Sequence, residues 1–118
     1  MGGSKNFAEE GVFKYKSDRK IAGIKVIEGK GTLHNMPMFS GDSDKYLRTN
    51  HEGEPITIRL FKNHAAEKDI DWGHKHGEFA LGEIHVHEFK NGKRMSPRKP
   101  SAEERRLVEE VKRDGKRL

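Results

Sequence analysis

The stretch ITIRLFK, residues 56–62, carries the clearest structural pattern in this chain of 118 residues. Successive side chains of a β-strand point to opposite faces, so the aliphatic residues Ile56, Ile58 and Leu60 share one face. The other face takes a mixed set with Arg59 at its centre. The stretch therefore predicts a strand with one face toward a core, and the fold is built outward from it.

Neighbouring segments predict more strands. Residues 12–16 alternate apolar and basic side chains, and residues 21–27 are rich in β-branched residues. Residues 79–90 are typical of one long or bent strand with a kink at Gly82. Asn91-Gly92 is the favoured pair for a tight turn and predicts a hairpin into a short strand at residues 93–95.

Two connections have no strand pattern. Residues 32–55 are polar and irregular, and a Ser/Asp start favours a single helical turn at Asp44 to Arg48. Residues 63–69, NHAAEKD, are typical of a second helical turn before Ile70.

The best-marked helix is at the C-terminal end. Ser101 follows a proline and can cap the first free backbone amides, with Glu104 completing a capping box. Gly115 suits a left-handed C-terminal cap. The apolar stripe is thin and contains Leu107, Val108 and Val111, so the helix packs lightly on a sheet or rests on a partner.

The summed pattern predicts an α+β fold, a small mainly antiparallel β-sheet with a C-terminal α-helix. Residues 1–6 are expected to be a flexible leader and residues 7–118 a single domain. The chain has no cysteine, no signal-peptide core and no apolar run long enough for a membrane span. A cytoplasmic protein is the expectation, and its oligomeric state stays open.

The positive charge is concentrated at one end. Residues 90–118 contain eleven Lys or Arg and five Asp or Glu, whereas the first 89 residues contain thirteen and fourteen. Such asymmetry is typical of a segment that meets nucleic acid, with RNA favoured here, or an acidic protein surface. A solvated tail with incidental charge is the alternative.

Residues 71–89, DWGHKHGEFALGEIHVHEF, contain four of the seven histidines as two His-x-His pairs. If Ile84 and Val86 face the core, His85 and His87 point together to the opposite, solvent-facing side. Paired imidazoles on one face can act as acid and base on one substrate or chelate one cation.

The leading hypothesis is a small basic RNA-directed protein, with metal-independent cleavage of the phosphodiester bond as its reaction. Such chemistry needs a base, an acid and a cation beside the phosphate, and no cofactor. His85 and His87 are the candidate acid and base, assisted by His74 or His76, with Arg59 on the phosphate. The candidate nucleic-acid contacts are basic or aromatic: Lys90, Lys93, Arg94, Arg98, Lys99, Trp72 and Phe89.

Two other functions remain open. His74, His76, His85 and His87 could instead hold zinc or nickel as a metal-binding domain. Alternatively, the chain is a non-catalytic interaction or inhibitor protein of the phage or mobile-element type that docks through its basic helix and tail. Under a plainer interpretation, His85 and His87 are only the polar positions of an amphipathic strand, and Trp72 belongs to the core.

Overall fold

The computed structural model describes residues 19–27, 36–41, 43–50, 52–73, 77–80 and 82–115. These residues form seven strands and one helix in chain order. The elements are β1 (Lys20–Ile21), β2 (Ile24–Ile27), β3 (Lys45–Thr49), β4 (Pro55–Lys62), β5 (Ala65–Asp71), β6 (His85–Lys90), β7 (Lys93–Arg94) and α2 (Ala102–Gly115).

The strands form one sheet in the order β1 to β7, so each strand lies beside its neighbour in the sequence. Every pair is antiparallel except β2 and β3, which are parallel. The α+β class with a mainly antiparallel sheet and a C-terminal helix is confirmed, although seven strands make a larger sheet than the small one predicted. Within the described ranges, no helix combines the length and apolar content that a membrane crossing requires.

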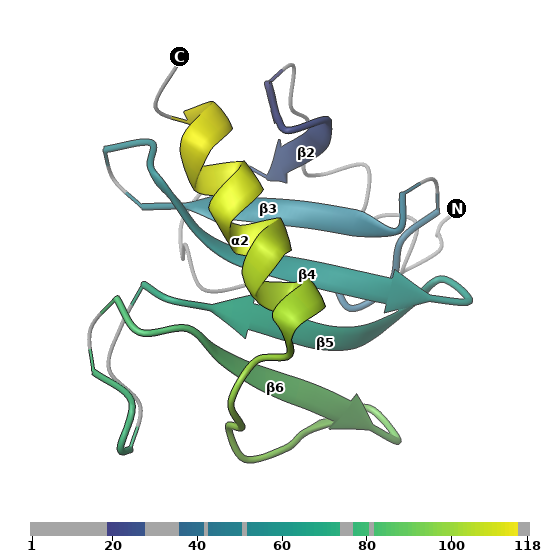
Figure 1. Cartoon of the computed structure of the whole chain (residues 1–118). Helices are drawn as coiled ribbons and strands as arrows, with labels where there is room; N and C mark the ends of the chain where they lie inside the picture. Colours follow the sequence, from purple (N-terminus) through teal and green to yellow (C-terminus); the bar gives the residue numbers. More distant parts are fainter. Residues whose placement is uncertain are drawn as a thin grey trace.

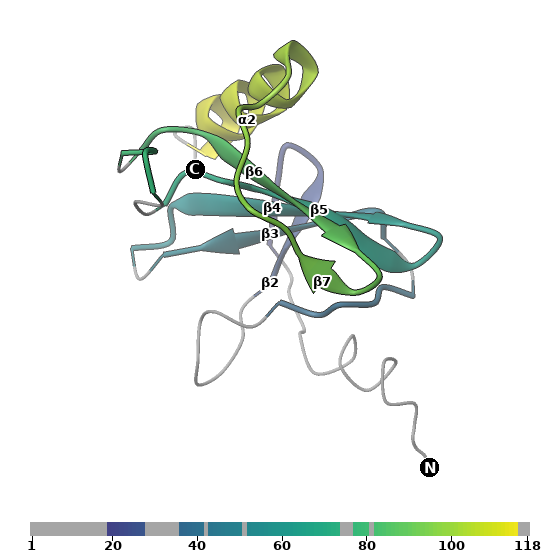
Figure 2. The same cartoon turned by 90° about the horizontal axis from the view of Figure 1, so that it is seen from below.

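Helix α2 crosses one face of the sheet diagonally (Figure 1) and stands on that side only, as the view turned by 90° shows (Figure 2). Val108 and Val111 of the helix are fully buried and belong to one apolar cluster with Ile58 of β4, Ile70 of β5 and Val86 of β6. The thin apolar stripe of the sequence is therefore sufficient to hold the helix on the sheet, because the strands supply most of the apolar surface.

The first turn of α2 has the predicted capping box. The Ser101 amide donates to Glu104 Oε1 over 2.8 Å, and the Glu104 amide donates to Ser101 Oγ over 3.1 Å. The prediction of a left-handed cap at Gly115 is wrong, because Gly115 is the last residue of the helix and is not among the glycines with positive φ.

Glu104 also ties the start of the helix to the sheet. It accepts a two-fold hydrogen bond from Arg98 over 2.9 and 3.0 Å and one from Lys68 of β5 over 2.7 Å. Burial alone would raise the pKa of the Glu104 carboxyl, but the hydrogen bonds from Arg98, Lys68 and the Ser101 amide outweigh it and hold the pKa well below its usual range.

Three predicted elements differ from the structure. The supposed single strand at residues 21–27 is a tight hairpin, because Ala22 and Gly23 both have positive φ and turn β1 into β2. The supposed helical turn at residues 44–48 is largely strand β3, and that at residues 63–69 is a turn at Asn63-His64 leading into β5. Pairing with the neighbouring strand outweighs the local helical signal in both places.

Two strand predictions near the histidines hold in part. The strand expected at residues 79–90 forms only from His85 onward, as β6, with Gly82 at φ 88° before it. The hairpin at Asn91-Gly92 is confirmed, since both residues have positive φ and join β6 to β7. The strand predicted at residues 12–16 lies outside the described residues.

Candidate functional site

Charged and polar side chains stand in two rows on the sheet face that α2 does not cover. The strand register pairs Arg59 of β4 with Asp69 of β5, and Asp69 with His87 of β6. One step along the strands, Thr57 is paired with Asp71 and Asp71 with His85. Directly paired residues share a face of the sheet, so all six side chains point to the same side. All six are also buried, with exposed fractions of 8% or less.

Arg59 and Asp69 form a buried, bidentate ion pair. Arg59 Nε and Nη2 donate to the two carboxylate oxygens of Asp69 over 2.6 and 2.8 Å. The remaining guanidinium nitrogen, Nη1, donates to the backbone carbonyls of Met36 and Pro37 over 3.0 and 3.3 Å. The sequence predicted that Arg59 binds a phosphate. To do so, Arg59 would have to exchange these contacts or share its nitrogens between them and the phosphate.

One of the two carboxylate oxygens of Asp71 is held by neutral hydrogen-bond donors. Its Oδ1 accepts hydrogen bonds from the Thr57 hydroxyl over 3.1 Å and from the Gly73 amide over 3.2 Å. Thr57 Oγ1 accepts in turn from Arg48 Nη2 over 3.3 Å. The other oxygen, Asp71 Oδ2, lies 4.0 Å from His85 Nε2, which places an imidazole beside a carboxylate in a buried setting.

Arg94 of β7 spans both aspartates more loosely than Arg59 binds one. Its Nη2 lies 3.5 Å from Asp69 Oδ2 and 3.8 Å from Asp71 Oδ2, and its side chain is 40% exposed. These separations exceed those of a charge-assisted hydrogen bond, so Arg94 is attracted to the pair of carboxylates without being locked to either. It is the cation of this cluster that can most easily turn toward a ligand.

A cavity of about 330 Å³ opens among these groups, and we call it the arginine cavity. The described residues that line it are Met36, Arg48, Thr57, Arg59, Asp69, Asp71, Phe89 and Arg94. Among these described residues, three guanidinium groups face two carboxylates. The pKa of Arg48 is lowered by burial and further by Arg59 and Arg94, while Asp71 and Asp69 oppose that change. Burial is thus costly for the Arg48 cation.

The two described histidines of the pattern lie beside this cavity without lining it. His85 and His87 share a face as predicted, with ring centroids 5.2 Å apart, but the expectation that they face solvent is wrong: they are 0% and 2% exposed. Both sides of β6 are buried at residues 85–87, because Val86 packs under α2 while the two imidazoles end the two rows on the opposite face.

Backbone carbonyls fix the orientation of both rings. His87 Nδ1 lies 2.8 Å from the carbonyl oxygen of Met95, and His85 Nδ1 lies 3.3 Å from that of Glu83. A carbonyl only accepts, so Nδ1 carries the proton in both rings. In the neutral imidazole, Nε2 is then the nitrogen that can take a proton, and in His85 this nitrogen faces Asp71.

The other half of the histidine pattern, His74 and His76, lies outside the described residues. Among the described residues, no three His, Asp or Glu side chains are grouped so that they could hold a metal ion. The alternative site for zinc or nickel includes His74 and His76, so it stays a prediction.

The remaining sequence candidates separate into three groups. Phe89 lines the arginine cavity, and its ring lies 5.0 Å from the Arg59 guanidinium carbon. Trp72 lies in the core beneath α2, as the plainer interpretation expected, and not at this cavity. Arg98 is bound to Glu88 and Glu104, whereas the side chains of the following lysines are exposed: Lys90, Lys93 and Lys99.

Four polar residues of the arginine cavity were not among the sequence candidates: Arg48, Thr57, Asp69 and Asp71. A signal for the two aspartates was present in Asp-Ile-Asp at residues 69–71, where acidic side chains alternate with one apolar residue. Interpreted as a strand beside Thr-Ile-Arg at residues 57–59, this pattern would have placed an acidic partner against Arg59. This pattern was missed because the sequence analysis predicted a helical turn at residues 63–69.

Comparisons with known proteins do not supply a family. No protein-family model matches the chain, and no curated protein or solved structure matches it significantly. The functional argument therefore depends on the residues themselves.

Proposed function

We propose that this protein binds single-stranded RNA, with one phosphodiester group in the arginine cavity, and that it cleaves the bound strand without a metal. The observation that carries the proposal is the position of Arg94: its side chain is 40% exposed, it lines a cavity of about 330 Å³, and its guanidinium lies 3.5 and 3.8 Å from the nearest oxygens of Asp69 and Asp71. A phosphodiester carries one negative charge and offers the paired oxygens that guanidinium groups match.

The loosely held Arg94 favours a ligand of this kind. Burial lowers the pKa of Arg48, although Asp71 and Asp69 raise it more than Arg59 and Arg94 lower it. An anion would therefore be bound mainly by Arg94, whose contacts to Asp69 and Asp71 are long. Phe89 offers an aromatic wall for an adjoining base.

Cleavage is proposed because a proton-exchanging group stands next to the same cavity. In RNA the 2′-hydroxyl can attack the phosphorus, forming a 2′-O–P bond while the P–O5′ bond breaks. A base takes the 2′-hydroxyl proton and an acid protonates the departing 5′ oxygen, which gives a cyclic phosphate. His85 does not line the cavity and acts through Asp71, which does and whose Oδ2 lies 4.0 Å from His85 Nε2. We assign to this pair the removal of the 2′-hydroxyl proton and its return to the departing 5′ oxygen.

The binding test uses Arg94→Ala, with Arg105→Ala on the exposed side of α2 as its control, because both remove one guanidinium. Fluorescence anisotropy of a labelled single-stranded RNA should show about tenfold weaker binding for Arg94→Ala than for the control. Equal affinities of the two variants for RNA would contradict the proposed binding site.

The cleavage test uses His85→Asn, whose amide keeps a donor toward the Glu83 carbonyl but has no group in place of Nε2. His64→Asn is the matched control, since His64 Nδ1 also contacts a backbone carbonyl, that of Ser40, over 2.8 Å. Cleavage of RNA, followed on gels with DNA of the same sequence as the inert reference, should fall about a hundredfold or more for His85→Asn alone. RNA left intact by the wild type would remove the catalytic half of the proposal and leave the binding half standing.

A further inference from the structure

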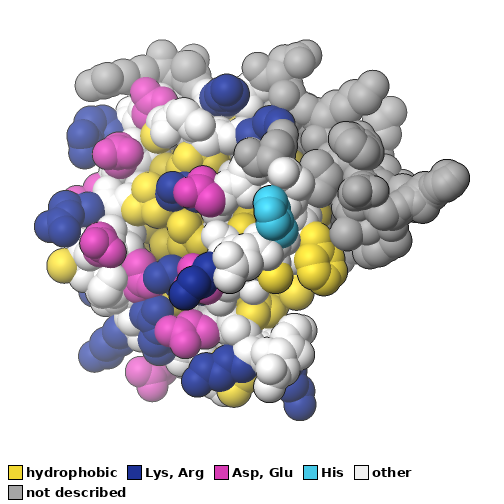
Figure 3. Space-filling view, turned by 90° about the vertical axis from the view of Figure 1, so that its right-hand side faces the viewer, with side chains coloured by type: hydrophobic (Ala, Val, Ile, Leu, Met, Phe, Trp, Pro, Cys, Tyr) yellow, Lys and Arg dark blue, Asp and Glu magenta, His cyan; other side chains and the backbone are white. Residues whose placement is uncertain are grey.

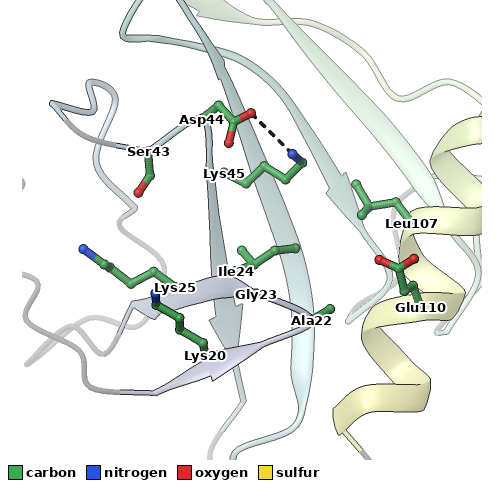
Figure 4. A pocket seen from close by; sticks show the side chains of 10 residues that line it. All are labelled: Lys20, Ala22, Gly23, Ile24, Lys25, Ser43, Asp44, Lys45, Leu107 and Glu110. Carbon is green, nitrogen blue, oxygen red and sulfur yellow. Dashed lines mark hydrogen bonds and ion pairs between the residues drawn. The ribbon is translucent and has the colours of Figure 1, made fainter.

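Burial distinguishes the polar side chains of the arginine cavity from those of two other surfaces. On the face in Figure 3, basic and acidic side chains are interspersed and open to solvent. In a cavity of about 700 Å³ between the β1–β2 turn and α2, Lys45 Nζ lies 3.4 Å from Asp44 Oδ2, and the Asp44 side chain is 79% exposed (Figure 4). Such exposed pairs orient little, because water screens them. Thr57, Asp69 and Asp71 of the arginine cavity are 2% exposed or less and can therefore keep a fixed geometry.

The hydroxyl of Thr57 stands between a cation and a carboxylate. Arg48 Nη2 lies 3.3 Å from Thr57 Oγ1, and Thr57 Oγ1 lies 3.1 Å from Asp71 Oδ1. A guanidinium only donates hydrogen bonds, and an ionised carboxylate only accepts them. The Thr57 hydroxyl therefore accepts from Arg48 and directs its single proton to Asp71. The two hydrogen bonds run in one direction and strengthen each other.

The backbone of Gly73 supplies a second donor to the same oxygen. Its amide donates to Asp71 Oδ1 over 3.2 Å. A Cβ atom at this position would stand 2.6 Å from the Cβ atom of Ile56 on β4, which is too close without a shift of the chain. The adjoining Trp72 amide maintains this approach by donating to the Ile56 carbonyl over 3.0 Å. The glycine thus lets the chain pass close enough to β4 to keep its amide on Asp71.

The two donors on Oδ1 determine which oxygen of Asp71 takes up a proton. Hydrogen bonds to a carboxylate oxygen stabilise the negative charge on it. A proton on Oδ1 would also point at the hydrogens of the Thr57 hydroxyl and the Gly73 amide. Proton uptake is therefore directed to Oδ2, the oxygen that lies 4.0 Å from His85 Nε2 and 3.8 Å from Arg94 Nη2.

We propose that Thr57 is a positioning residue for the proton transfer assigned to Asp71 and His85, a role that rests on the proposed function. The 2′-hydroxyl proton passes to Asp71 Oδ2 as the 2′ oxygen bonds to phosphorus. The Asp71–His85 pair then gives this proton to the 5′ oxygen as the P–O5′ bond breaks. Thr57 exchanges no proton with the RNA. Its hydroxyl holds Asp71 so that Oδ2 stays beside Arg94 and the imidazole.

The test compares Thr57→Val, which replaces the hydroxyl by a methyl group, with Thr57→Ser, which keeps the hydroxyl. Thr49→Val is the control, because Thr49 of β3 undergoes the same loss but is not among the described residues that line the arginine cavity. Thr57→Ala removes the hydroxyl without adding a methyl group beside Asp71 and takes the place of Thr57→Val if that variant does not fold. Thermal unfolding of each variant establishes that it is folded.

Single-turnover cleavage of a labelled oligouridylate should be about thirtyfold slower for Thr57→Val than for Thr49→Val, because a hydrogen bond to a charged group is lost. Thr57→Ser should cleave within about threefold of the wild-type rate, since it keeps that hydrogen bond. An oligouridylate with methylated 2′-hydroxyls has no attacking group and reports binding alone. All four proteins should bind it with equal affinity, because no variant removes a charge.

The positioning role and the proposed function fail differently. If the wild type cleaves RNA and Thr57→Val cleaves as fast as Thr49→Val, the positioning role is wrong and the proposed cleavage stands. Equally slow cleavage by Thr57→Val and Thr57→Ser, or weaker binding of the methylated strand by Thr57→Val, would also overturn the role, because the hydroxyl would then not act through Asp71. If the wild type leaves RNA intact, the proposed cleavage and the positioning role are both overturned.

Discussion

The two faces of the central sheet are both buried, but by different means. On the α2 face, Ile58 of β4 and Ile70 of β5 are fully buried in an apolar cluster. On the opposite face, their sequence neighbours Arg59 and Asp69 are equally hidden from solvent, but as an ion pair. The alternation in the sequence identifies which side chains share a face. The alternation does not say whether the polar face is exposed to solvent.

The second face is the one that needs a functional explanation. A buried ion pair is seldom more stable than apolar residues of the same shape, because the loss of hydration offsets much of the attraction. The row of Arg59, Asp69 and His87 therefore contributes less to folding than an apolar row would. What it provides is an oriented set of charges beside a cavity, which is the requirement of a binding site.

Of the substitutions that test this contrast, Arg59→Leu should lower the free energy of unfolding most. The substitution leaves Asp69 buried without its bidentate partner, and losing one member of a buried pair costs about 3–5 kcal/mol. The free energy of unfolding, measured with urea, should fall by that amount. The double variant Arg59→Leu/Asp69→Leu should recover most of the loss, because no uncompensated carboxylate remains. A double variant as unstable as the single one would mean that the pair stabilises the fold in its own right.

A smaller effect is expected from Glu104→Gln, at the edge of the apolar face. Glutamine can still accept from the Ser101 amide but loses the charged contacts to Arg98 and Lys68, which should cost about 1.5–3 kcal/mol at neutral pH. The folded state holds the pKa of Glu104 well below its usual range, through the hydrogen bonds that outweigh burial.

The same substitution should change how stability depends on pH. A carboxyl whose pKa is lowered by folding stabilises the protein above its unfolded pKa of about 4.3 and loses that contribution as the pH falls further. The difference in unfolding free energy between wild type and Glu104→Gln should therefore be constant from pH 7 to about pH 5 and shrink below that. A difference that stays the same down to pH 3 would assign the effect to packing and not to charge.

Local signals predicted the parts of the fold that are locally determined. Asn91-Gly92 favours its turn by backbone preference alone, and Ser101 with Glu104 completes a cap within four residues. The strands β3 and β5 were missed, because their sequences favour turns or helix until a neighbouring strand offers hydrogen bonds. His64 has a left-handed φ of 69°, which few histidines adopt, so the turn before β5 gave little warning.

The candidate site was predicted in part for the same reason. Arg59, Phe89 and Arg94 were candidates on the strength of their chemistry, and they do line one cavity. The carboxylates Asp69 and Asp71 were missed, because which side chains meet across strands depends on register, and register follows from pairing along the whole sheet. The burial of His85 follows from contacts on both sides of β6, which a pattern within one strand does not contain.

The smallest effect should come from Ile58→Val, one residue before Arg59 on the same strand but facing α2. Removing one buried methylene costs about 0.5–1.5 kcal/mol, because the apolar contact is lost and the neighbours only partly close the gap. That cost should be the same at pH 7 and pH 4, since no titratable group changes its surroundings, and RNA affinity should be unaltered. If Ile58→Val weakened RNA binding as much as Arg94→Ala does, the two faces would be mechanically coupled. The cavity would then depend on the packing of α2 as well as on its own charges.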